Sequence, residues 1–178
     1  SLLQEDRVFK PSETFAARAN ASDPAIYEWA DADDLAFWES WAEKLHWYRR
    51  WDKVLDWTEA PFAKWFVGGK INACYNAVDR HVEAGLGDKI AIVGEGEPGD
   101  VQTLSYAQVK DEVGRIANAL KSLGVGRGDR VCLYMPMVPA LGLTMLACAR
   151  IGAAHSVVFG GFSAESLHDR INDAKAKV

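Results

Sequence analysis

Residues 131–170 constrain the fold most strongly, because strand-like and helix-like segments alternate there without a break. A strand-like run at 130–134 precedes an apolar helical segment that reaches about Arg150, and a second strand-like run at 154–159 leads through a Gly-Gly turn into another helical pattern. This alternation is typical of an α/β protein whose parallel strands are joined by right-handed crossovers. Residues 174–178 have the pattern of a helix end followed by the start of a strand. We therefore expect the sequence to stop in the middle of a fold.

The clearest predicted helix follows Ser105. Ser105 and Gln108 fit a capping box, in which each side chain bonds the backbone amide of the other residue. Apolar side chains then recur every three or four residues along one face, namely Tyr106, Val109, Val113, Ile116 and Leu120. Gly124 ends this helix. Residues 89–93 and 101–104 flank a Gly-rich turn and predict a hairpin ahead of it.

The first part of the chain is rich in tryptophan, with all seven residues between Trp29 and Trp65. A helix from about Asp34 to Arg49 is predicted by the spacing of Trp38, Trp41, Leu45 and Tyr48. A second helix is predicted over 70–84, ending at Gly85 and Gly87. We interpret the rings mainly as packing residues that hold an N-terminal segment on a larger body. The alternative is an exposed aromatic patch for a protein, a sugar, a methylated amine or single-stranded nucleic acid.

Charge and cysteine content exclude several classes. The net charge of −5 and the lack of a basic run argue against a nucleic-acid partner. No apolar run approaches the roughly 20 residues of a membrane helix, and the polar first residues do not resemble a signal peptide. The three cysteines and four histidines show no metal-ligand spacing. We predict free, buried thiols in a cytoplasmic protein, and structural or solvent roles for His155 and His168.

Two glycine-rich stretches are candidate phosphate-binding loops. The first, at 124–128, follows a helix and precedes a strand, which is the reverse of a dinucleotide fingerprint, so we interpret it as a helix stop and a tight turn. The second comprises Phe159, Gly160 and Gly161 and has the favourable order of strand, glycines and helix N-terminus. Backbone amides there could face an anion, although a close turn without a ligand explains the pattern equally well. No catalytic acid/base pair or nucleophile is predicted.

Five segments together resemble the N-terminal part of acetate–CoA ligases (acetyl-CoA synthetases), which belong to the adenylate-forming superfamily. They are Lys64–Asn72 (KWFVGGKIN), Tyr75–His81 (YNAVDRH), Tyr134–Pro139 (YMPMVP), Met145–Ala153 (MLACARIGA) and His155–Ser163 (HSVVFGGFS). The resemblance runs from about Trp29 to the last residue. Ala140 departs from it, because the family usually has Glu there.

The resemblance implies an α/β fold with a parallel-type sheet and flanking helices. Residues 1–87 would be a helical, Trp-rich extension, and residues 88–178 the beginning of an AMP-binding domain. It also implies synthesis of acetyl-CoA from acetate, Mg-ATP and coenzyme A through an acetyl-adenylate. Phe159, Gly160 and Gly161 would line part of the coenzyme A site. The family's ATP-contacting motifs do not occur in these residues, so we expect the chain alone to be inactive and to bind no cofactor tightly.

Three alternatives stay open on the sequence alone. A propionate–CoA ligase has very similar N-terminal motifs, and the acyl pocket that separates the two activities is not present in this sequence. A non-catalytic module that binds coenzyme A or a nucleotide would need only the strand, Gly-Gly and helix arrangement. A Trp-rich interaction domain would need an exposed aromatic patch. For the ligase, the expected partners are small-molecule substrates and the rest of its own chain, with neither nucleic acid nor a membrane.

Overall fold

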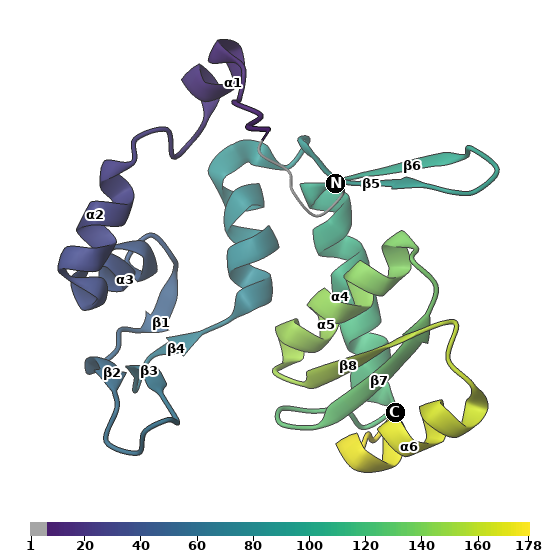
Figure 1. Ribbon diagram of the computed structural model, residues 1–178. Coiled ribbons are helices and arrows are strands. Elements are labelled where there is room, and N and C mark those ends of the chain that lie inside the picture. The colour runs from purple at the N-terminus through teal and green to yellow at the C-terminus, as the bar shows by residue number, and fades with distance from the viewer. Residues whose placement is uncertain (1–6) are drawn as a thin grey trace. The chain divides into compact units, whose positions relative to one another are not determined.

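The computed structural model describes residues 7–178, which fall into two compact units (Figure 1). One unit holds the residues up to Lys44 together with Lys53–Val67, and the other holds Leu45–Asp52 together with Gly68–Val178. Within residues 7–178, no helix is both long enough and apolar enough to cross a membrane.

The first unit contains three short helices and a hairpin. The helices are α1 (Glu13–Arg18), α2 (Ala25–Ala32) and α3 (Asp34–Ala42), and strand β2 (Lys53–Asp56) pairs antiparallel with β3 (Lys64–Val67). The Asp33 carboxylate accepts a hydrogen bond from the Ala36 amide at 2.9 Å and so fixes the start of α3. Phe37 packs edge-to-face against Trp29, with ring centroids 5.0 Å apart.

The predicted burial of the tryptophans is wrong for most of them. Trp51, in the second unit, is 7% exposed, but five tryptophans of the first unit keep 40–53% of their surface exposed. These five are Trp29, Trp38, Trp41, Trp57 and Trp65. Trp29, Trp38 and Trp41 contact the Phe37 ring, and Trp38 also contacts Trp65. The helical spacing thus indicated ring contacts and not burial.

The predicted helix from Asp34 to Arg49 is wrong in its second half. Helix α3 ends at Ala42, and Trp47–Arg49 forms strand β1, which pairs antiparallel with β4 (Lys70–Ile71). The Asn76 side chain binds both backbone groups of His46, accepting from the amide at 2.8 Å and donating to the carbonyl at 2.9 Å. These contacts from 30 residues away override the local helical periodicity.

The helix predicted over 70–84 begins later than expected, and most of it is π-helical. Lys70 and Ile71 belong to β4, and the chain then forms two π-helical segments, η1 (Tyr75–Asp79) and η2 (Val82–Leu86). The Asn72 side chain accepts from the Tyr75 amide at 3.0 Å and so helps to start the helical turns. Gly85 has a left-handed φ of 83° but lies inside η2, so it kinks the segment, and the helical turns end at Leu86, just before Gly87.

The hairpin and the central helix are confirmed. Strand β5 (Ile90–Glu95) pairs antiparallel with β6 (Val101–Ser105), and α4 (Tyr106–Ser122) follows directly. In the capping box the Gln108 amide donates to Ser105 Oγ at 3.3 Å, and the Ser105 amide donates to Gln108 Oε1 at 2.8 Å. The buried face of α4 consists of Val109, Val113, Ala117 and Leu120.

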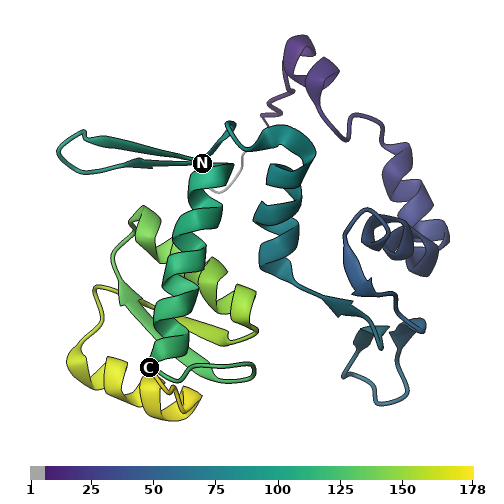
Figure 2. The same ribbon diagram turned by 180° about the vertical axis from the view of Figure 1, so that it is seen from behind.

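Strands β7 (Arg130–Met135) and β8 (Ala154–Phe159) are parallel and in register from Arg130↔Ala154 to Met135↔Phe159. Helix α5 (Pro139–Ile151) connects them, and α6 (Ala164–Ala174) follows β8. Figures 1 and 2 show α5 and α6 on opposite sides of this strand pair. The core of the unit lies where α4, α5 and β7 meet, and includes Val113, Val131, Ala147 and Cys148.

The structure is α/β, but its sheets are small. Among the described residues β7–β8 is the sole parallel pair, and the other three sheets are two-stranded and antiparallel. The Lys177 amide donates to the Arg130 carbonyl at 2.8 Å, and the Cys132 amide donates to the Val178 carbonyl at 2.7 Å. Residues 177–178 thus lie along β7, as expected for the start of a strand, while β8 has β7 as its only strand neighbour within residues 7–178.

Candidate functional site

The predicted turn, Phe159–Ser163, lies at the carboxyl ends of the two parallel strands. Phe159 is the last residue of β8, in register with Met135 at the end of β7, and Ser163 is the N-cap of α6. The Ser163 side chain accepts from the Ser166 amide at 3.3 Å. Open α/β sheets generally bind ligands outside the carboxyl ends of their strands, so the fold places this turn where a ligand site is expected.

The glycines of the turn allow a close approach to its backbone. A Cβ at Gly160 would meet its nearest neighbour, the Met135 carbonyl oxygen, at 3.9 Å, which is ordinary contact. A Cβ at Gly161 would come within 2.7 Å of the Phe159 ring. The Phe159 ring therefore lies over Gly161, and packing within the turn needs glycine at 161 more than at 160.

The turn is exposed and carries two aromatic rings. Phe159 is 66% and Phe162 41% exposed, and their rings meet edge-to-face with centroids 6.2 Å apart. The Arg170 guanidinium lies over the Phe162 ring, 4.6 Å from its centroid. An exposed ring pair beside a cation and a helix N-terminus can accommodate a ligand with a planar group and negative charge.

Tyr134 is a residue of this site for which the sequence suggested no role. It lies on β7, and its hydroxyl is 2.9 Å from the Gly160 carbonyl oxygen and 3.0 Å from that of Phe162. The sequence has no local pattern that indicates this role, because Tyr134 and Gly160 are 26 residues apart and meet only through the pairing of β7 with β8.

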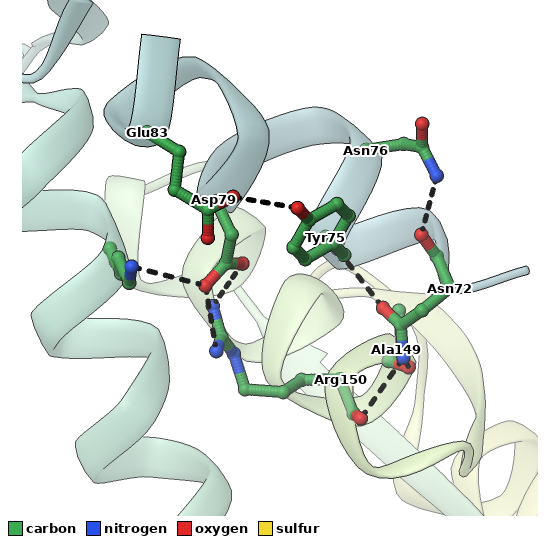
Figure 3. Close-up of polar contacts among 8 residues, drawn as sticks. Asn72, Tyr75, Asn76, Asp79, Glu83, Ala149 and Arg150 are labelled. Atoms are coloured by element: carbon green, nitrogen blue, oxygen red, sulfur yellow. Dashed lines mark hydrogen bonds and ion pairs between the residues drawn. The ribbon is translucent and has the colours of Figure 1, made fainter. Parts of the chain in front are cut away.

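A second polar cluster joins η1 to α4 and α5 (Figure 3). Arg150 donates to both carboxylate oxygens of Asp79, at 2.7 and 3.2 Å, and Lys110 Nζ lies 3.7 Å from the same carboxylate. The Asn72 side-chain amide donates to the carbonyls of Ala149 and Arg150, both at 3.1 Å. These partners compensate the buried Asp79 charge and the last carbonyls of α5, so we interpret the cluster as a structural joint.

Two titrating groups near this joint have altered pKa values. Burial raises the pKa of the Cys74 thiol, and the positive charge of Arg150 opposes part of that shift. The hydrogen bond from the Tyr75 hydroxyl to Glu83, at 2.6 Å, raises the pKa of Tyr75. Both shifts favour the protonated forms, so neither group is poised as a nucleophile or base at neutral pH.

The remaining sequence predictions concern residues outside the turn. His155 and His168 are exposed, and His168 contacts its helix neighbours Asp169 and Asn172. Cys74 and Cys148 are buried, as predicted, whereas Cys132 is half-buried, and all three thiols are free. In residues 7–178 no group of His, Cys, Asp or Glu could hold a metal ion.

The other glycine-rich stretch is a helix stop, as predicted. Gly124 and Gly128 have left-handed φ values of 81° and 86°, and Asp129 accepts from the Gly126 amide at 2.8 Å. The Gly126 amide and, next, Lys177 hold the pKa of Asp129 below its usual value. The acceptor for the Gly126 amide at this turn is therefore an aspartate of the chain itself.

An apolar groove of about 440 Å³ lies between β5 and the start of α5. Its walls include Ile92, Val93, Val138, Leu141 and Met145. The groove has few polar groups, and nothing in its lining indicates a particular ligand.

Comparison with known proteins identifies the family. The family model described as "AMP-binding enzyme" matches residues 78–178, and the one described as "Acetyl-coenzyme A synthetase N-terminus" matches residues 24–77. The chain is 59% identical, over 97% of its length, to a protein of Rubrobacter xylanophilus named acetyl-coenzyme A synthetase. Proteins of the same name from Streptomyces coelicolor and Deinococcus radiodurans are 57% and 53% identical over 100% of this chain.

The chain spans 27% of the length of the Rubrobacter and Streptomyces relatives and 28% of that of the Deinococcus relative. The AMP-binding match extends over more than half of the chain and includes α4, β7, α5, β8 and the Phe159–Ser163 turn. On this match, the chain belongs to the family of AMP-binding enzymes.

Proposed function

We propose that this chain is the N-terminal part of an AMP-forming acetate–CoA ligase. In the first step a carboxylate oxygen of acetate attacks the α-phosphorus of Mg-ATP, and pyrophosphate leaves. In the second step the thiol sulfur of coenzyme A attacks the acetyl carbonyl carbon, loses its proton, and AMP leaves. The observation that supports this most directly is the 53–59% identity, over nearly the whole chain, to proteins named acetyl-coenzyme A synthetase.

Within such an enzyme, the described residues would supply scaffold and one wall of the coenzyme A site. Phe159, Gly160 and Gly161 would form that wall, with amides that can face a phosphate and rings that can contact a base. The boundary of the AMP-binding domain near residue 87, the cytoplasmic location and the lack of a nucleic-acid partner stay predictions.

A propionate–CoA ligase is the neighbouring candidate, but the names of the relatives favour acetate. A non-catalytic module that binds coenzyme A would use the same turn without the two chemical steps. Mass spectrometry of the native gene product separates a ligase from the non-catalytic module. A product several hundred residues longer supports the ligase, whereas a native product ending at Val178 favours the module. Acetate-dependent pyrophosphate release by the 178-residue chain alone would overturn its predicted inactivity.

The turn itself can be tested by Gly160→Ala in the full-length ligase. The added methyl group would be in ordinary contact with the fold, so we expect normal folding but a higher KM for coenzyme A, because the ligand could approach the backbone less closely. Gly114→Ala on α4 is the matched control, since a Cβ there meets nothing within 4 Å. An unchanged KM for coenzyme A in Gly160→Ala would contradict the proposed wall.

A further inference from the structure

The carbonyl groups of the Phe159–Ser163 turn converge on a single side chain. The Tyr134 hydroxyl reaches the Gly160 carbonyl at 2.9 Å and the Phe162 carbonyl at 3.0 Å. A tyrosine hydroxyl has one proton to donate, so the two carbonyls share or alternate in accepting it. Both must point toward Tyr134 for this geometry to hold.

Because the peptide group is planar, this contact also fixes the direction of the Gly161 and Ser163 amides. In a planar trans peptide the N–H of a residue points opposite to the C=O of the residue before it. Carbonyls of Gly160 and Phe162 that face Tyr134 therefore direct the N–H groups of Gly161 and Ser163 to the other side of the turn. Neither amide has an acceptor among residues 7–178, so both are available to a ligand.

The turn has few other restraints. Its backbone is closed by one hydrogen bond, from the Phe162 amide to the Phe159 carbonyl at 3.1 Å. The Phe159 and Phe162 rings contact each other rather than a buried layer, since both are exposed. Among the described residues, Tyr134 supplies the only side-chain hydrogen bonds to 159–162. Besides the Arg170 guanidinium over the Phe162 ring, the Tyr134 hydroxyl is thus the side-chain contact that orients the turn against the sheet.

We propose that Tyr134 is a positioning residue for coenzyme A, which orients the amides of Gly161 and Ser163 toward the ligand's phosphate groups. This inference rests on the proposed function, because it assumes that the ligand at the turn is coenzyme A. Tyr134 itself need not touch the ligand, since it acts through the backbone that it holds. Its effect should therefore appear in the second chemical step and not in the first.

The test is Tyr134→Phe in the full-length ligase, which keeps the ring and removes only the hydroxyl. We expect the KM for coenzyme A to rise roughly five- to tenfold, the factor that corresponds to the net free energy of one hydrogen bond. Acetate-dependent exchange of pyrophosphate with ATP does not require coenzyme A, and its rate and its KM values for acetate and ATP should stay unchanged. Tyr75→Phe is the matched control, because it removes a hydroxyl bonded to Glu83 outside the site.

Each outcome decides between the possibilities. A rise in the KM for coenzyme A in Tyr134→Phe, but not in Tyr75→Phe, supports the positioning role. An unchanged KM, or an equal loss in both chemical steps with a lower Tm, overturns it and leaves a structural tyrosine. If the unsubstituted full-length protein shows no acetate-dependent exchange, the proposed function fails, and the inference about Tyr134 fails with it.

Discussion

Substitution of Asp79 by Asn should destabilise the unit that contains α4 and α5. Asp79 is 7% exposed and bonds Arg150 through both carboxylate oxygens, at 2.7 and 3.2 Å, with Lys110 Nζ at 3.7 Å. An Asn amide keeps one acceptor but places an NH2 group against a guanidinium and leaves the Arg150 charge unpaired. Arg150 Nε is already buried without a hydrogen-bond partner, so the guanidinium depends on Asp79 for its charged acceptor.

The expected cost is set by the strength of the lost contacts and by solvent. Hydrogen bonds to charged groups contribute about 1.5–3 kcal/mol each, and removing one partner of a buried pair costs about 3–5 kcal/mol. The Arg150 and Lys110 side chains are 27% and 36% exposed, so water can compensate part of the loss. We therefore expect a decrease of about 2–3 kcal/mol in the free energy of unfolding, which corresponds to about 5–10 °C in Tm for a chain of this size.

The assay is thermal unfolding of the 178-residue chain followed by circular dichroism, with Glu112→Gln as the matched control. Glu112 also pairs with an arginine, at 2.6 Å, but both side chains of that pair are exposed. Its loss should change the free energy of unfolding by less than about 0.5 kcal/mol. A Tm change for Asp79→Asn no larger than that for Glu112→Gln would refute the argument that burial makes the Asp79 joint important.

Three further perturbations test the fold. Ser105→Ala removes the N-cap of α4 and should cost about 1 kcal/mol in a denaturation experiment, whereas Ser122→Ala at the end of the same helix should have little effect. Burial raises the pKa of Cys74 and Cys148 above the ordinary thiol value of 9.0. As the pH rises, the thiols of the unfolded chain therefore lose their protons before those of the folded chain. The Tm should consequently fall as the pH rises through 9. Replacing both thiols with Ala should flatten that fall, and an unchanged slope would contradict it. The isolated chain should self-associate through the β8 edge, and Val157→Lys, at a 43% exposed position of β8, should reduce association in sedimentation velocity; a concentration-independent monomer of the unsubstituted chain would refute this.

Local signals in the sequence predicted the elements that depend on neighbouring residues. The capping box at Ser105, the periodic face of α4 and the stop at Gly124 were all correct, because each is determined within a few residues along the chain. The position of the Gly-Gly turn between a strand and a helix was correct for the same reason.

Long-range contacts determined what the sequence could not predict. Leu45 and Tyr48 do have helical spacing, but the backbone groups of their segment bond to the Asn76 side chain and to strand β4, so no helix forms there. The Tyr134 contact and the Asp79 joint connect residues 26 and 71 positions apart. Neither has a pattern in the linear sequence, because strand register and helix packing decide which side chains meet.

The Asp79 joint and the Tyr134 contact separate stability from binding in the proposed ligase. The Asp79 joint holds η1 against α4 and α5, which form the core behind β7, and within residues 7–178 no hydrogen bond or ion pair connects it to the Phe159–Ser163 turn. Loss of the joint should lower the free energy of unfolding, but in the folded protein the Gly161 and Ser163 amides should keep their orientation. The Tyr134 hydroxyl is on an exposed side chain at the strand end, so its loss removes little burial but frees the turn. We therefore expect Asp79→Asn to lower the Tm without changing the KM for coenzyme A. Tyr134→Phe should raise that KM without lowering the Tm.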